Sequence, residues 1–176
     1  PAHAHAVYNL LLQANMAARR PDYEQLLEER ARLRPDDQGQ HAQALRASTA
    51  SYRDVFTAQQ QREQLRWAWH HFFGEHDLLL TPITVTPAFA HDHSEPMPAR
   101  TMRVNGVQLP YFNQLFWAGL ATASFLPATI APAGLSPEGL PVGVQIVGPE
   151  MADRRTIWLA GELAGLIGGF QAPPGY

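Results

Sequence analysis

The chain has 176 residues, of which 45% are apolar, a size and composition typical of a globular protein with one main core. Its formal net charge is −3 and it carries no basic stripe, which argues against a nucleic-acid partner. No apolar run approaches the roughly 20 residues of a membrane span, so we expect no membrane association. The absence of cysteine excludes disulfides and a cysteine nucleophile and fits a reducing compartment, so we expect a cytoplasmic protein.

Two features of the composition bear on mechanism. The chain begins at Pro1 without an initiator methionine, so we expect a processed, trimmed or excised piece. Its N-terminus also lacks the charged-then-apolar pattern of a signal peptide. All 13 basic residues are arginine. Chemistry that needs a lysine amine therefore cannot be completed within these residues.

Helices are predicted first along the chain. Residues 7–18 are apolar and alanine-rich enough for a mostly buried helix. Asp22 and Gln25 have the spacing of a capping box, which predicts a second helix that ends before Pro35. Residues 1–47 are therefore interpreted as a helical lead-in.

The longest predicted helix runs from about residue 50 to 73, with Ser48 or Ser51 as its cap. Apolar residues recur along it at spacings near three, four and seven, which indicates one buried stripe and one solvated face. Gly74 is expected to end this helix. A short apolar strand is predicted at 77–83.

The segment 84–107 has no periodicity and is rich in proline, so it is predicted to be an irregular loop that covers part of the protein. After Pro110, residues 111–125 are apolar on every side, which predicts a buried helix.

The last third of the chain is predicted to be a hairpin and a helix. Residues 127–134 are interpreted as an extended strand, 136–139 as a turn, and 140–149 as a strand built to be buried. Asp153 is expected to cap a final amphipathic helix, and 168–176 to form a frayed tail.

Motifs that carry chemistry are scarce. None of the five serines lies in a G-x-S-x-G elbow, and no glycine-rich phosphate loop is present. Histidines cluster at 70–76 and at 91–93, but adjacent histidines on a helix point about 100° apart and the H-x-x-x-H spacing is missing. We therefore expect no metal site, and we assign the tryptophans to core packing.

Three ordered stretches carry a family resemblance. They are DLLLTPITVTPAF at 77–89, PATIAPAG at 127–134 and GLPVGVQIVGP at 139–149. In this order and at these separations they resemble the C-terminal part of the amidase signature family, most clearly over residues 50–168. The resemblance implies an α/β fold with a mixed β-sheet covered by helices, incomplete in this chain, so that 1–176 form the C-terminal segment of an amidase domain.

The chain also departs from that family. Where members commonly carry Asn and then Gly in an A-N-L-x-G-x-P stretch, this sequence has Thr122 and Phe125 within ATASFLP. A phenylalanine at a usual glycine position implies a reshaped pocket wall.

The resemblance implies hydrolysis of a carboxylic amide to an acid and an amine or ammonia. The family uses a serine nucleophile, a second serine joined by a cis peptide and a lysine base, with no cofactor. Those residues lie in a region upstream of this chain, so no residue here is assigned as catalytic. The partners implied are this upstream part and a small amide substrate, and a homo-oligomer is possible. Candidates for the substrate pocket wall are Thr84, Phe116, Trp117 and Phe125.

Alternatives from other classes stay open. A stand-alone interaction or scaffold domain that has lost the catalytic half predicts a stable, monodisperse fold at 19.5 kDa. A hydrolase or metal-binding protein that uses its histidines predicts activity or bound metal that disappears when His91 and His93 are replaced. A non-hydrolysing member of the same family is a third possibility.

Overall fold

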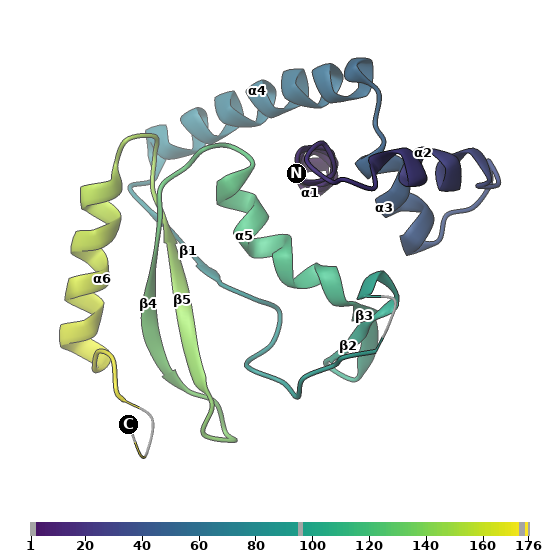
Figure 1. Ribbon diagram of the computed structural model, residues 1–176. Helices are drawn as coiled ribbons and strands as arrows, with labels where there is room; N and C mark the ends of the chain where they lie inside the picture. Colours follow the sequence, from purple (N-terminus) through teal and green to yellow (C-terminus); the bar gives the residue numbers. More distant parts are fainter. Residues whose placement is uncertain (1–2, 95–96, 173–174, 176) are drawn as a thin grey trace. The chain divides into compact units, whose positions relative to one another are not determined.

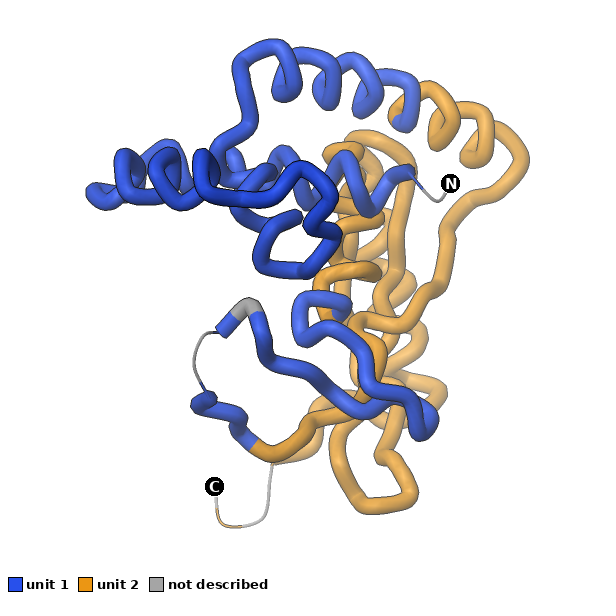
Figure 2. The backbone as a smooth tube through the Cα atoms, turned by 90° about the vertical axis from the view of Figure 1, so that its right-hand side faces the viewer, with its two compact units in different colours: residues 1–65, 91–113 blue, residues 66–90, 114–176 orange. Residues whose placement is uncertain are grey.

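The computed structural model describes residues 3–94, 97–172 and 175 (Figure 1). The chain folds into two compact units, each made of two stretches of sequence (Figure 2). Unit 1 comprises Pro1–Leu65 and His91–Asn113, and unit 2 comprises Arg66–Ala90 and Gln114–Tyr176.

Unit 1 is built mainly from helices that pack through small and aliphatic side chains. These helices are α1 (His3–Ala17), α2 (Tyr23–Ala31), α3 (Gln40–Ser48) and the first part of α4 (Tyr52–Glu75). One apolar cluster joins Val7 and Leu11 of α1 to Ala58 and Leu65 of α4. A second cluster joins Ala17 to Leu26 and Leu45. The stripe of α4 that faces α1 is the one expected from its spacing.

The capping box predicted at the start of α2 is wrong. Asp22 occupies the N-cap position but makes no side-chain hydrogen bond to the helix. Its carboxylate instead accepts a hydrogen bond from Arg20 Nε at 2.9 Å, and the bonds from Arg20 hold its pKa below the ordinary value. An oxygen held by a guanidinium is not free to accept the backbone N–H groups of the first turn. Helix α3 was not predicted as a separate helix, although Ala42 and Leu45 have the spacing of a buried helical face.

The predicted cap of α4 is confirmed at Ser51. The Ser51 hydroxyl donates to Asp54 Oδ2 at 2.6 Å, and Asp54 N–H donates to Ser51 Oγ at 3.2 Å. The Ser51 N–H donates to the same carboxylate at 3.0 Å, which completes a reciprocal capping box. These bonds, led by the one from the Ser51 hydroxyl, lower the pKa of Asp54.

Replacing Ser51 by alanine is expected to raise the pKa of Asp54 toward its ordinary value. Because the carboxyl pKa is depressed in the folded state, its stabilising effect is present above the ordinary pKa and is lost as pH falls through the depressed one. An NMR titration of the Asp54 carboxyl in the parent protein and in Ser51→Ala measures the difference. Equal pKa values in the two proteins would exclude the capping box as the cause.

The segment expected to be irregular from 84 to 107 contains more order than predicted. Met97–Ala99 form a 3₁₀ turn, η1, and a hairpin pairs β2 (Thr101–Val104) with β3 (Val107–Pro110). Asn105 and Gly106 between the strands both have positive φ, at 49° and 82°. An Asn-Gly pair at positive φ is the usual two-residue hairpin turn, and it was present in the sequence. Part of the expected loop, residues 95–96, lies outside the described residues.

Unit 2 is an α/β structure around a three-stranded sheet. Its strands are β1 (Leu79–Pro82), β4 (Ala128–Leu135) and β5 (Pro141–Val147), in the order β1-β5-β4. Among the described residues, both pairings in this sheet are antiparallel, with Leu80 opposite Ile146 and Ile146 opposite Thr129. The predicted α/β class and the three predicted strands are therefore confirmed.

The buried strand β5 lies at the centre of the sheet and supplies its most enclosed side chains. Ile146 and Val147 are both 0% exposed. Helix α6 (Asp153–Ile167) lies alongside β4 (Figure 1), where Thr156 Oγ1 and Thr129 Oγ1 are 2.8 Å apart and share a hydrogen bond. The β4–β5 hairpin turns at 136–139 as predicted, with Ser136 N–H donating to Leu140 O at 2.8 Å.

Two helix boundaries in unit 2 differ from the predictions. Helix α5 covers only Leu115–Thr122 and follows a 3₁₀ turn, η2 (Tyr111–Gln114), so the apolar segment 111–125 is not one helix. Asp153 is the first residue of α6, and Ala152 is its N-cap without a side-chain bond, so the predicted cap is wrong. Of the predicted tail 168–176, residues 173–174 and 176 lie outside the described residues. In the described part of the chain, every helix is too short or too polar to form a membrane span.

Candidate functional site

The predicted pocket residue Thr84 lies beside an open cavity in unit 2. The cavity has a volume of about 340 Å³ and is lined by residues 82–88, which follow β1, and by residues 141–143 at the start of β5. Thr84 Oγ1 donates to Thr86 O at 2.7 Å, and Gln114 Nε2 donates to Thr86 Oγ1 at 3.3 Å. The segment after β1 is thus held by its own hydroxyl groups and leaves Thr84 exposed at the cavity.

Gly143 lines this cavity without contributing a side chain to it. A Cβ at this position would overlap Ile83 Cδ1 and would lie 3.3 Å from Ala131 O. A side chain here would therefore require Ile83 to change rotamer and would press on the backbone of β4 at Ala131. The glycine in the middle of GLPVGVQIVGP is explained by this close approach.

Gln145 connects the sheet to α5. It is 4% exposed, and its Nε2 donates to Thr81 Oγ1 of β1 and to Trp117 O of α5, both at 3.1 Å. Buried amide groups need such partners, because an unsatisfied one is costly. The local sequence around Gln145 does not indicate these partners, which lie far away along the chain.

The other three predicted pocket residues do not line the cavity at Thr84. Phe116 and Trp117 pack edge to face on α5, with ring centroids 5.1 Å apart, and neither is among the residues that line the cavity at Thr84. Phe125 follows α5 and is 56% exposed, with the Arg66 guanidinium carbon 5.8 Å from its ring centroid. The assignment of all four residues to a pocket wall stays a prediction.

Phe125 adopts a backbone conformation that favours glycine. Its φ is +58°, in the left-handed region. This region costs an L-residue with a Cβ roughly 1–2 kcal/mol, and a bulky residue there is an outlier. The position is the one at which the resembling family commonly has glycine, so the chain keeps a glycine-like turn with a phenylalanine in it.

The substitution Phe125→Gly is expected to leave the protein more stable than Phe125→Ala, by about 1–2 kcal/mol. Both variants remove the ring and its contact with Arg66, but alanine retains the Cβ that disfavours positive φ. The order is the reverse of the usual one, since glycine normally destabilises relative to alanine. Denaturant unfolding of the two variants measures the difference, and a more stable alanine variant would show that the turn is not strained.

The described residues contain no serine bonded to a histidine or lysine base. The hydroxyls of Ser48 and Ser51 contact Gln13 and Asp54. Ser136 Oγ accepts the N–H of Leu140 at 3.3 Å, and Ser124 Oγ is buried without a partner. An activated serine needs its base within hydrogen-bond reach, and these contacts supply none.

Within residues 3–94, 97–172 and 175, no group of three or more histidine, cysteine, aspartate or glutamate side chains is arranged to hold a metal ion. His91 and His93 lie near one another, with ring centroids 5.7 Å apart. Two rings on an exposed loop do not make a closed set of ligands.

Comparison with known proteins places these features in a family. A family model described as Amidase matches residues 6–157. No curated protein matches the chain. The fold is similar to a crystal structure of an amidase, with a TM-score of 0.69 and 24% identity over 94% of this chain and 36% of that one.

Two further solved structures share the fold. A bacterial aryl acylamidase of the amidase signature family has a TM-score of 0.57 and 21% identity, over 97% of this chain and 37% of that chain. A 6-aminohexanoate cyclic dimer hydrolase has a TM-score of 0.53 and 24% identity, over 77% of this chain and 29% of that chain. The chain thus spans about a third of the length of these proteins. Because the family model matches most of its residues, the chain belongs to the amidase family.

Proposed function

We propose that this chain is the C-terminal segment of an amidase that hydrolyses a carboxylic amide to an acid and an amine or ammonia. The family match over residues 6–157 carries the proposal, together with the coverage of only 36% of a similar amidase. The reacting groups, a serine, a second serine joined by a cis peptide and a lysine, belong in this proposal to a part upstream of Pro1. No cofactor takes part.

The composition of the chain supports the proposal that the reacting groups lie outside it. It contains no lysine, and its serines are used for caps and turns or are buried without a base. A hydrolase of this chemistry requires a base that removes the serine proton, so the 176 residues alone are expected to be inactive. The names of similar proteins, an aryl acylamidase and a cyclic dimer hydrolase, agree with a reaction at a carbon–nitrogen bond.

The sheet of unit 2 also supports an upstream partner segment. Strands β1 and β4 are its outer strands, and no strand of the described residues pairs with their second edges. Leu80, Ile130 and Leu135 on these strands are more than half exposed. Open strand edges that carry apolar side chains are normally covered in a folded protein. In this proposal, strands of the catalytic part extend the sheet.

The role of the chain in the reaction is to shape the acyl pocket. Thr84 is the proposed polar contact, because it is exposed at a cavity whose floor Gly143 keeps open. Phe116, Trp117 and Phe125 are the proposed aromatic wall for a small amide substrate. We place the complete protein in the cytoplasm, and assembly into a homo-oligomer is compatible with its exposed apolar surface.

The test compares the complete natural protein with the isolated 176-residue chain on a panel of small aryl and alkyl amides. The complete protein is expected to release acid and amine and to be inactivated by a fluorophosphonate, which phosphonylates reactive serines with loss of fluoride. The isolated chain is expected to do neither. Replacing His91 and His93 in the complete protein is expected to leave the rate unchanged.

Three results would contradict the proposal. Amide hydrolysis by the isolated chain would place the reacting groups within it. Loss of activity in the His91 and His93 variant would favour histidine-based chemistry. A complete protein that binds amides but never hydrolyses them would favour a family member that has lost its reaction.

A further inference from the structure

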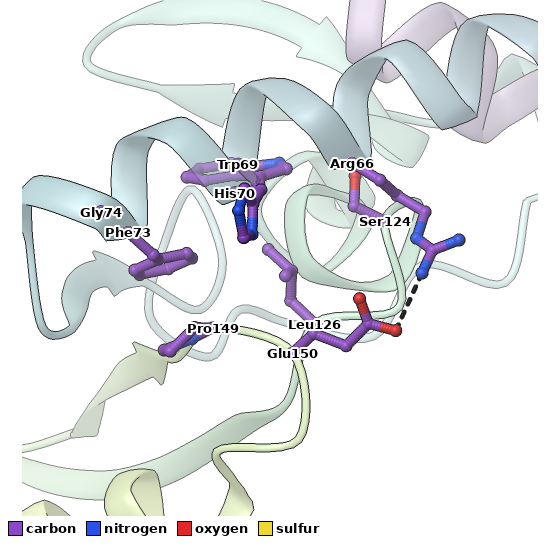
Figure 3. A pocket seen from close by; sticks show the side chains of 9 residues that line it. All are labelled: Arg66, Trp69, His70, Phe73, Gly74, Ser124, Leu126, Pro149 and Glu150. Carbon is purple, nitrogen blue, oxygen red and sulfur yellow. Dashed lines mark hydrogen bonds and ion pairs between the residues drawn. The ribbon is translucent and has the colours of Figure 1, made fainter.

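A second cavity of unit 2 lies at the end of the sheet opposite to Thr84. It has a volume of about 190 Å³ and lies between the last turns of α4, the turn before β4 and the turn after β5 (Figure 3). Leu126 precedes β4 and Pro149 follows β5, where Ala128 pairs with Val147. Thr84 lies near the other end, where Pro82 pairs with Val144.

The walls of this cavity are mostly apolar and aromatic. Phe73 projects from α4 toward Pro149, and Trp69 lies along the preceding turn of the same helix (Figure 3). The two aromatic rings are 5.7 Å apart and nearly parallel. A dry apolar cavity of roughly 150 Å³ is enough to hold one benzene ring, so a single six-membered ring fits this space.

Ser124 contributes a buried hydroxyl group to this cavity. It lines the cavity, is 2% exposed, and its Oγ makes no hydrogen bond with any described group. Buried hydroxyls in folded proteins are almost always hydrogen-bonded, so this one calls for a partner that the described residues do not provide. A hydroxyl both donates and accepts, and it can therefore pair with either kind of group on a ligand.

The charges at the rim favour a neutral ligand. Arg66 Nη2 and Glu150 Oε1 form an ion pair at 2.8 Å, shown as a dashed line in Figure 3. Each charge is already balanced by the other, and His70 lies apart from this pair, between Trp69 and Leu126 (Figure 3). A carboxylate ligand would meet Glu150 and an ammonium ligand would meet Arg66, while a neutral ring disturbs neither.

We propose that this cavity binds a small neutral aromatic molecule that bears one hydroxyl group, with the ring packed against Trp69, Phe73 and Leu126 and the hydroxyl hydrogen-bonded to Ser124 Oγ. None of the four residues proposed for the acyl pocket lines this cavity, and binding here does not depend on amide hydrolysis. Phenol is the simplest molecule of this class. For so small a ligand we expect a dissociation constant of about 1 mM.

The test titrates phenol, toluene and benzoate into the complete natural protein, with binding followed by protein-observed NMR. Phenol is expected to shift the Leu126 methyl signals and to show intermolecular NOEs to them, and benzoate at the same concentration is expected not to bind. Ser124→Ala is expected to weaken phenol binding about three- to tenfold and to change toluene binding less than twofold. Only phenol can form a hydrogen bond with the Ser124 hydroxyl, so only its affinity depends on that group.

The control variant Ser136→Ala removes a hydroxyl in the β4–β5 turn and is expected to leave phenol binding unchanged. Several results would overturn the proposal: no binding of phenol at about 10 mM, benzoate binding as well as phenol, or an equal loss of phenol and toluene in Ser124→Ala. If Ser124→Ala does not fold, the NOEs to Leu126 and the rejection of benzoate in the parent protein decide the matter, and their absence would refute the site.

Discussion

Ile146→Ala is expected to lower the free energy of unfolding by about 3–4 kcal/mol, the largest effect of any single substitution considered. Ile146 is 0% exposed at the centre of the sheet, opposite Leu80 on one side and Thr129 on the other. Removing three carbons there forfeits their transfer energy and leaves a cavity that the paired strands cannot close. Denaturant unfolding of the complete protein measures the loss.

The matched control is Ile146→Val, which removes one methylene group from the same side chain. It is expected to cost about 0.5–1.5 kcal/mol. The two values should rise with the volume deleted, because both variants keep the strand and its hydrogen bonds. An alanine variant that loses less than about 1 kcal/mol would mean that this side chain is not part of a close-packed core.

Gly148→Ala is expected to lower the free energy of unfolding by about 1–3 kcal/mol, in the range of overpacked cores. A Cβ at Gly148 would lie 2.8 Å from Thr156 Cγ2 and 3.4 Å from Leu78 Cδ2. Thr156 cannot turn away easily, because its Oγ1 donates to Asp153 O and is paired with Thr129 Oγ1, each at 2.8 Å. The added methyl would therefore force α6 away from the sheet.

The double variant Gly148→Ala with Thr156→Ser tests this cause. Serine keeps the hydroxyl and its hydrogen bonds but lacks the Cγ2 that the new methyl group meets. Most of the stability lost in Gly148→Ala is expected to return in the double variant. If the double variant is less stable than Gly148→Ala by the amount that Thr156→Ser alone loses, the overlap with Cγ2 is not the reason for the glycine.

The strands of the sheet were predictable because their signals are local. Pro141 and Pro149 bound an apolar, β-branched run, and the run became β5, the buried central strand. The hairpin at Asn105–Gly106 had an equally local signal, the Asn-Gly pair, which the proline-rich surroundings obscured. This hairpin could therefore have been predicted from the sequence.

Helix caps and the candidate site were harder to predict, since they depend on competition between partners. Asp22 is held by Arg20 and Asp153 lies inside α6, whereas Ser51 and Asp54 cap α4 as their spacing indicates. The partners of Gln145 are 64 and 28 residues away along the chain, beyond any local pattern. The departure at Phe125 could be seen in the sequence, but its positive φ could not.

The most direct test of the central claim is the intact mass of the protein isolated from its natural source, with fragmentation to read the residues ahead of Pro1. We expect a mass much greater than 19.5 kDa. The residues upstream of Pro1 are expected to include a lysine and a segment rich in glycine and serine. An intact mass near 19.5 kDa for the protein from its natural source would contradict the proposal of a single-chain enzyme. It would leave either a separate catalytic partner or a binding domain without chemistry of its own.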